Sequence, residues 1–298
     1  MTGLAADMTA RSAEVTALDW YHTIELPGGV LTPGFYDHRP VVGRLPIPPS
    51  LSGMRCLDVG SSDGFWAFEM WRRGAAEVVS VDLDDPARQE WQGPARRDRG
   101  SVASTSGAWE GDRGRTGRAF ELARSALGAD VSRLDLSVYD LSPEIAGSFD
   151  FVFMGSLLLH LRDPAGALAA VRSVVAGRFL LFEPILLSLS LLFPRTPLAS
   201  LWQLDEPRWW LPNRAGLRRL VEAAGFDVLS AGGPCAQKFG RGFPRRPPRR
   251  TPTLSEVLFW TVVRPLGVPS AWVLAEPPGP GTGSRARAKT RVPLLGWV

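Results

Sequence analysis

Cysteine and long apolar segments are both scarce in this sequence. Cys56 and Cys235 are its only cysteines, and they lie too far apart for a metal-binding spacing. So few cysteines in 298 residues favour a reduced, cytoplasmic protein over a disulfide-rich secreted one. Residues 1–19 have no apolar core of a signal peptide, and the longest apolar stretch, 185–193, is too short to cross a bilayer. We therefore expect no membrane span.

Lysine and histidine are also rare. Lys238 and Lys289 are the only lysines, so arginine carries nearly all of the positive charge behind a net charge of +4. A GC-rich coding sequence would produce the same bias, so the charge points only weakly to nucleic acid. His22 and His38, with Asp37, match no standard zinc spacing, and hydrogen-bonded structural roles are expected for them. We predict no metal site.

What the sequence does contain is an alternation of strand-like and helix-like segments. Short apolar runs predict strands at 55–59, 78–81, 131–138, 151–154, 178–183 and 226–230. Helices are expected at 64–73, 116–127, 164–175, 214–224 and 254–264, with Asn213 as a cap and Gly225 as a stop. This order predicts an α/β fold, a doubly wound and mainly parallel Rossmann-like sheet.

The turn after the first core strand carries the most informative motif. Asp58, Gly60 and Gly64 follow the pattern D-x-G-x-x-x-G between a strand and a helix. A dinucleotide fingerprint has a second glycine where this chain has Ser62, and that glycine admits a pyrophosphate. An acidic residue at the strand end is favourable beside an ammonium group and unfavourable beside phosphates. The motif therefore predicts S-adenosylmethionine as the cofactor rather than NAD.

Acidic residues at the next two strand ends support this interpretation. Asp82 lies 22 residues after Gly60, where a carboxylate commonly grips a ribose diol. Leu83 can cover one face of the adenine, and Asp140 can accept a hydrogen bond from the adenine amino group. The full set of expected cofactor-binding residues is Asp58, Gly60, Ser61, Gly64, Asp82, Leu83, Asp140, Leu141 and Gly155.

Several segments also match a known family. They are Trp20-Tyr21-His22-Thr23-Ile24, Thr32-Pro33-Gly34, Tyr36-Asp37, Gly155-Ser156-Leu157-Leu158-Leu159-His160 and Trp209-Trp210-Leu211-Pro212-Asn213. With the glycine motif, they resemble the class I S-adenosylmethionine-dependent methyltransferases, and within them a subgroup that includes the tRNA wobble-uridine (5-carboxymethoxyuridine) methyltransferases and carboxymethyltransferases. The resemblance implies a seven-stranded methyltransferase sheet at about 54–230.

The chain departs from that subgroup at two points. The tRNA enzymes have a long N-terminal extension with a lysine that helps to hold carboxy-S-adenosylmethionine, whereas residues 1–19 contain no lysine. Leu159 replaces the tyrosine that the subgroup has before the histidine of this motif. Both differences favour plain methyl transfer.

The resemblance also suggests how the chain is divided. We expect an N-terminal tail and cover at 1–50, the class I methyltransferase domain at 51–275, and a disordered tail at 276–298. Insertions are expected near 86–117 and 185–212, the second acting as a lid over the acceptor. Tyr21 and Tyr36 are expected to help close the cofactor pocket.

The acceptor is less well defined by the sequence. His160 could act as a general base or only cap its loop, and Glu183 could bind a polar acceptor or pair with an arginine. The apolar segments at 185–193 and 202–210 favour a small-molecule acceptor with an apolar part, although they could also touch a membrane surface or be ordinary core. Arginines at 241–250 keep tRNA as an alternative, and a non-catalytic cofactor-binding protein is a further one. The oligomeric state is not predicted.

Overall fold

The computed structural model describes residues 12–85, 88–90, 117–201, 208–243, 257 and 259–279. Several expectations therefore lie outside the described residues. They concern most of the insertion near 86–117, the lid residues 202–207, the arginines at 245–250, the first part of the helix expected at 254–264, and the tail from residue 280.

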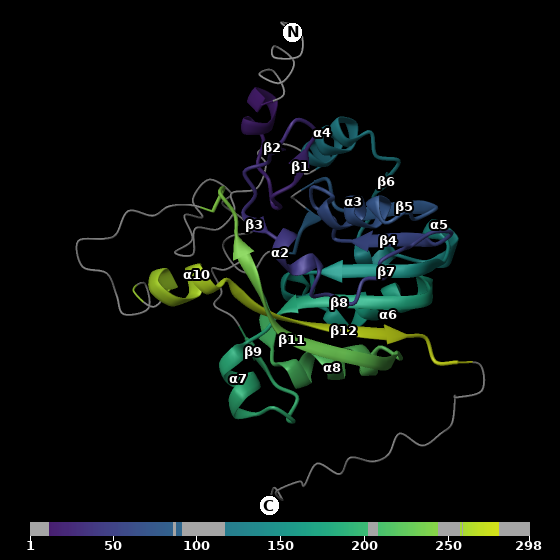
Figure 1. The fold of residues 1–298 in the computed structure, drawn as a ribbon. Helices are drawn as coiled ribbons and strands as arrows, with labels where there is room; N and C mark the ends of the chain where they lie inside the picture. Colours follow the sequence, from purple (N-terminus) through teal and green to yellow (C-terminus); the bar gives the residue numbers. More distant parts are fainter. Residues whose placement is uncertain are drawn as a thin grey trace, which may run out of the picture.

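A single large sheet forms the centre of the molecule (Figure 1). Its strand order is β3-β11-β12-β8-β7-β4-β5-β6. In chain order these strands are β3 (Tyr36–Asp37), β4 (Arg55–Val59), β5 (Glu77–Asp82), β6 (Ser132–Asp135), β7 (Phe149–Gly155), β8 (Val175–Pro184), β11 (Asp227–Phe239) and β12 (Val268–Glu276). Strands β4 to β8 are mutually parallel, and β12 runs antiparallel to β8. The predicted doubly wound, mainly parallel sheet is confirmed.

Helices cover both faces of this sheet because its central strands are apolar on both sides. One buried cluster joins alternate strand residues to α3 (Phe65–Arg72), α4 (Gly117–Leu127) and the N-terminal segment. The other joins the intervening strand residues to α6 (Pro164–Val174) and α8 (Arg214–Ala223). The remaining short elements are α2 (Arg39–Val42), α5 (Pro143–Ala146), and the hairpins β1 (Glu25–Leu26) with β2 (Val30–Leu31) and β9 (Ala199–Leu201) with β10 (Trp210–Pro212).

Short elements at the carboxyl edge of the sheet matter most for the site. The 3-10 helices η3 (Val138–Asp140) and η4 (Leu158–His160) follow β6 and β7. Helix α7 (Leu187–Leu192) follows β8, and a π-helical turn (Phe259–Val263) leads into α10 (Arg264–Leu266). Figure 1 shows α7, β9 and α10 on the side toward which the arrows of β7 and β8 point. None of the helices in the described ranges is long and apolar enough to cross a membrane.

The observed sheet differs from the expected one at its antiparallel edge. Among the described residues it has eight strands rather than seven, because Tyr36 and Asp37 of the cover pair with Phe239 and Lys238 of β11. Strand β12 is not predicted from the sequence, and β11 continues far beyond the strand expected at 226–230. In sequence, the glycines and proline at 232–234 suggest that the strand ends there. A register shift between Gly232 and Cys235 instead lets β11 continue through them.

The helix boundaries agree more closely with the sequence. The side chain of Asn213 accepts a hydrogen bond from the backbone N–H of Gly216 at 2.7 Å, so the predicted cap of α8 is confirmed. Gly225, expected as the stop, has a φ of 89° just after the helix ends. Of the helix expected at 254–264, the structure describes residue 257 as helical, the π-helical turn, and Arg264 at the start of α10.

Candidate functional site

The loop between β4 and α3 forms the floor of the site. Gly60, Ser62 and Gly64 have φ angles of 75°, 50° and 87°, so the chain turns sharply through the left-handed region. A Cβ atom on Gly60 would lie 2.9 Å from a side-chain carbon of Leu157, and one on Gly64 would lie 2.6 Å from the Phe120 ring. A side chain at either position would combine a left-handed backbone with a close contact, so glycine is favoured at both and the loop can pack closely on its neighbours.

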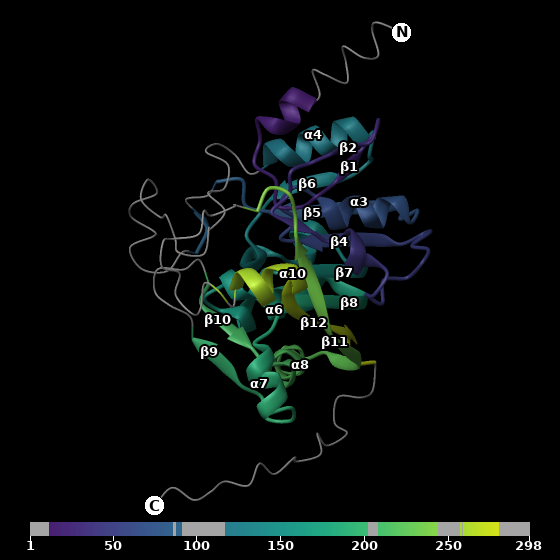
Figure 2. The ribbon, with the colours of Figure 1, turned by 60° about the vertical axis from the view of Figure 1, so that its left-hand side comes forward.

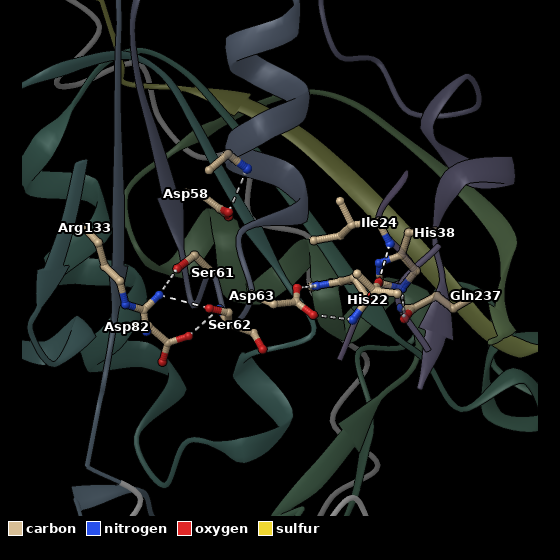
Figure 3. A network of polar contacts seen from close by, with 12 residues as sticks. His22, Ile24, His38, Asp58, Ser61, Ser62, Asp63, Asp82, Arg133 and Gln237 are labelled. Atoms are coloured by element: carbon tan, nitrogen blue, oxygen red, sulfur yellow. Dashed lines mark hydrogen bonds and ion pairs between the residues drawn. The ribbon is translucent and has the colours of Figure 1, made fainter. Parts of the chain in front are cut away.

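Asp82 at the end of β5 holds this loop in place. Its carboxylate accepts a hydrogen bond from the backbone N–H of Ser62 at 2.5 Å (Figure 3). It also accepts one from the backbone N–H of Leu83 at 2.7 Å. Burial raises the pKa of Asp82, while nearby Arg133 and these two N–H groups oppose the rise. Each carboxylate oxygen has two lone pairs, so the same group can accept further bonds from a ligand diol.

Arg133 is a site residue that the sequence reasoning missed. From β6 its guanidinium donates to Ser61 Oγ at 2.9 Å and to the carbonyl oxygen of Ser62 at 3.0 Å (Figure 3). It also pairs with Asp84 at 3.0 Å, so it joins the loop after β4 to the segment after β5. The sequence did contain a signal for this residue, since an arginine inside a predicted strand places a charge in the interior. Such a buried charge needs polar partners.

Asp58 lies buried beneath the loop. One of its carboxylate oxygens accepts a hydrogen bond from the backbone N–H of Ala67 in the first turns of α3, at 3.0 Å. Burial raises the pKa of Asp58 to about 8, and the bond from Ala67 opposes this rise. Without a cationic ligand the group is therefore largely protonated near neutral pH. An ammonium group placed next to such a carboxyl group lowers its pKa and so favours the ionised form.

The N-terminal cover is bound directly to the cofactor loop. Asp63 accepts a hydrogen bond from the backbone N–H of His22 at 2.7 Å, and its other oxygen lies 2.5 Å from His22 Nδ1 (Figure 3). Both side chains are buried. Sequence reasoning placed His22 in a structural hydrogen bond but did not identify Asp63 as the partner. The pair fixes the cover over the loop that turns between Gly60 and Gly64.

A second buried network lies next to this pair. His38 Nε2 lies 2.9 Å from Gln237 Oε1, and the Gln237 amide nitrogen donates to Ser156 at 3.1 Å and Ser270 at 2.8 Å. Both expected structural histidines are thus hydrogen-bonded. Within the described ranges, no group of three or more His, Cys, Asp or Glu side chains is arranged to hold a metal ion.

Tyr21 and Tyr36 meet above the end of β7. Their ring centroids are 5.3 Å apart, and Tyr21 hydrogen-bonds Ser156. Burial raises the pKa of Tyr21 well above its usual value, with Tyr36 and Glu183 adding to the rise. Tyr21 therefore stays a neutral phenol, and the cover contributes aromatic surface and a hydroxyl group at this edge of the sheet.

Glu183, next to the last residue of β8, is buried. Its Oε1 accepts hydrogen bonds from the backbone N–H groups of Leu157 at 2.8 Å and Leu158 at 3.0 Å. Burial raises the pKa of Glu183 to about 8, against the lowering effect of these bonds. The partners seen are backbone groups rather than an arginine, so the side chain supports the turn η4. His160, partly exposed, ends that turn.

The remaining predicted cofactor residues lie around the same edge. Leu141 is buried just after η3, whereas Asp140 is exposed on it. Gly155 ends β7, and a Cβ there would lie 2.8 Å from the Phe153 ring. The loop after β4 and its direct partners include six of the predicted residues, namely Asp58, Gly60, Ser61, Gly64, Asp82 and Leu83. The other three lie at the ends of neighbouring strands and are Asp140, Leu141 and Gly155.

The two lid tryptophans contact the opposite side of η4. The backbone N–H of Trp209 donates to the Leu159 carbonyl at 2.8 Å, and Trp210 Nε1 donates to the Leu161 carbonyl at 3.2 Å. Trp209 Nε1 also donates to the Glu90 carbonyl at 3.0 Å. The Arg162 guanidinium lies 4.9 Å from the Trp209 ring centroid. Trp209 and Trp210 are therefore bonded to the segment that carries His160.

Comparisons with known proteins agree with this geometry. The sequence profile of the methyltransferase domain family matches residues 36–231. No curated protein matches the chain at a significant level. Among solved structures, the N-terminal domain of EvdMO1 with S-adenosylhomocysteine bound is 17% identical, with a TM-score of 0.51, over 92% of this chain and 97% of that one.

Two further solved structures are more distant. A 1,6-didemethyltoxoflavin-N1-methyltransferase from Burkholderia thailandensis is 14% identical, with a TM-score of 0.45, over 76% of this chain and 72% of that one. Magnesium protoporphyrin IX methyltransferase from Synechocystis PCC 6803 is 16% identical, with a TM-score of 0.43, over 76% of each chain.

The family match covers more than half of the sequence, and the glycine loop and acidic strand ends lie within it. The chain belongs to the methyltransferase domain family. By this membership it is a class I S-adenosylmethionine-dependent methyltransferase. The match is to the general family and does not extend to the tRNA wobble-uridine subgroup.

Proposed function

We propose that this enzyme methylates an oxygen, nitrogen or carbon nucleophile of a small-molecule acceptor with apolar character. One observation carries the proposal. The cover reaches the loop after β7 at Ser156, through Tyr21, and the lid reaches the same loop at Leu159 and Leu161. Aromatic side chains thus approach the end of β7 from two sides. Such an enclosure suits a small apolar molecule better than a folded RNA stem.

The proposed cofactor positions follow from the loop system. Gly60, Ser61 and Gly64 would approach the cofactor through their backbone, Asp82 would accept from the ribose diol, and Asp58 would compensate the ammonium charge. Leu83 and Leu141 would cover the adenine, with Asp140 and Gly155 at its margin. Bound S-adenosylmethionine supplies an electrophilic methyl group on a sulfonium centre.

The protein's own contribution to the reaction is positioning. Alignment of the nucleophile with the bound methyl donor, in a site that excludes water, would supply much of the rate. A proton must leave only when the acceptor is not already deprotonated. We propose His160 as the acceptor of that proton. Glu183, protonated below pH 8, would position the η4 turn through its bonds to Leu157 and Leu158.

A labelling experiment tests the acceptor class. The protein is incubated with methyl-labelled cofactor and cell extract, with and without prior ribonuclease treatment. We expect the label in a low-mass, solvent-extractable fraction that ribonuclease does not remove. Label found only in RNA, and lost on ribonuclease treatment, would favour the tRNA alternative.

A competition between cofactors tests the subgroup. The carboxylate of carboxy-S-adenosylmethionine needs a cationic or hydroxyl partner, and Leu159 cannot supply one. We expect the ordinary cofactor to be used at least as well as the carboxylated one. A clear preference for the carboxylated cofactor would restore the wobble-uridine assignment.

A further inference from the structure

A group of exposed apolar side chains projects from the lid region. Leu191 and Leu192 of α7 are 72% and 71% exposed, and Leu201 of β9 is 87% exposed. Phe193 between them is also exposed. We call Leu191, Leu192, Phe193 and Leu201 the apolar tip. Figure 2 shows α7 and β9 beside each other below α10. Single exposed leucines are common, but four large apolar side chains on two adjacent elements mark a contact surface.

The second apolar group lies on α10 and the turn before it. Val262 and Leu266 are exposed there, and α10 lies on the same side of the sheet as α7 (Figures 1 and 2). Both groups follow strands whose ends form the active site. The exposed apolar surface is therefore concentrated at the carboxyl edge of the sheet.

The described residues of the same edge carry more basic than acidic side chains. Segments 185–201 and 208–221 together hold five arginines and no acidic residue, while Asp205 and Glu206 fall between them, outside the described residues. Segments 231–243 and 259–275 add three basic residues. Arg195 is exposed three residues after Leu192. Arg214 lies beside α7, because its backbone N–H donates to Ser190 Oγ at 3.1 Å. Two of the five, Arg218 and Arg219, pair with Glu222. Arg195, just after α7, and Arg214, the first residue of α8, are therefore the arginines nearest the apolar tip in the described residues.

The combination of exposed apolar side chains with nearby arginines favours one kind of partner over the others. RNA phosphates would attract the arginines but would leave the leucines in water. A second copy of the same face would bury the leucines but would bring like charges together. An anionic lipid surface satisfies both features, since apolar side chains enter the acyl boundary while arginines contact lipid phosphates.

We propose that the apolar tip, with Arg195 and Arg214, docks the enzyme reversibly on the surface of an anionic lipid bilayer. This contact is peripheral. It is independent of which acceptor is methylated.

Vesicle binding tests the proposal. The full-length protein is sedimented with sucrose-loaded vesicles of phosphatidylcholine alone, or of equal parts phosphatidylcholine and phosphatidylglycerol. We expect binding to the anionic vesicles only, decreasing as salt is raised. The triple variant L191S/L192S/F193S should lower the partition coefficient by about tenfold or more, since three apolar side chains no longer insert. The variant R195Q/R214Q should weaken the same binding.

A matched control separates the tip from general surface hydrophobicity. Ile145 on α5 and Leu229 on β11 are 58% and 45% exposed, and neither belongs to the apolar tip. The variant I145S/L229S should bind the vesicles as the unmodified protein does. All variants should keep the melting temperature and the affinity for S-adenosylhomocysteine, because none of these side chains contacts the cofactor loop.

Equal binding to neutral and anionic vesicles, or unchanged binding by the triple variant, would overturn the proposal. Binding to tRNA but not to vesicles would overturn it as well. So would a protein that binds no vesicles but is dimeric in light scattering, if the triple variant is a monomer.

Discussion

Asp58 is a buried carboxyl group whose state depends on what lies next to it. Its pKa of about 8 in the free enzyme means that it is mostly protonated at pH 7. The ammonium group of the cofactor favours the ionised form, so binding should release a proton. The affinity for S-adenosylhomocysteine should therefore rise as the pH increases from 6 to 8.

Calorimetry in two buffers of different ionisation enthalpy measures this proton release. We expect a value approaching one proton at pH 7, falling toward zero above pH 9. In Asp58→Asn, which can still accept from Ala67, the release should disappear and the affinity should fall. Equal proton release by the variant and the unmodified enzyme would mean that another group titrates.

At the scale of elements, the bond between His22 and Asp63 joins the cover to the loop between β4 and α3. A double-mutant cycle can isolate it. We expect His22→Ala and Asp63→Asn each to destabilise the protein by about 1–3 kcal/mol, because each leaves a buried polar partner unpaired. The double variant should be little worse than either single one. Urea denaturation measures all four proteins, and strictly additive losses would show that the pair is not coupled.

The lid gives a second prediction at this scale. Trp209→Ala removes the contacts with Glu90 and Arg162 and opens the site to water, so kcat should fall by more than about tenfold, or roughly 1.4 kcal/mol in the barrier. Replacing Arg245, Arg246, Arg249 and Arg250 with serine should cost less than that. Steady-state rates at two salt concentrations measure both. The reverse order of effects, with strong salt dependence, would favour RNA as acceptor.

The elements show how far sequence alone can lead. The parallel strands and the helices between them were predicted because each is a local pattern: an apolar run, a cap such as Asn213, or a glycine stop. The cofactor loop was predicted for the same reason. Three features were not predicted: the role of Arg133, the pairing of His22 with Asp63, and strand β12. Each of them depends on residues that are distant in the chain. Glu183 was identified, but its bonds to the η4 backbone could not be foreseen from sequence.

For the whole molecule, buried acidic groups predict an unusual pH dependence of stability. Asp58 and Glu183 have pKa values of about 8 in the folded state, well above those of unfolded carboxyl groups. Between about pH 4.5 and 8 the folded protein therefore binds more protons than the unfolded chain. Its stability should fall as the pH rises through this range, by up to about 1.4 kcal/mol per pH unit for each proton.

Thermal denaturation without ligand, from pH 5 to pH 8.5, measures this slope. Glu183→Gln retains an oxygen that can accept from Leu157 and Leu158 but cannot lose a proton. The variant should be more stable than the unmodified enzyme at pH 8 and should show a flatter profile. A stability that increases from pH 5 to pH 8 in the unmodified enzyme would contradict both assignments.

The pairing of β3 with β11 also determines the order in which the enzyme can be assembled. Tyr36 belongs to an early part of the chain, but its partner Phe239 is translated much later. During synthesis the cover cannot take its place in the sheet until β11 has left the ribosome. His22 is bridged to Tyr36, so the same event completes the support of the segment that Asp63 holds over the loop. The first segment to emerge is thus among the last to settle, and a nascent chain that stops before β11 has no closed cofactor site.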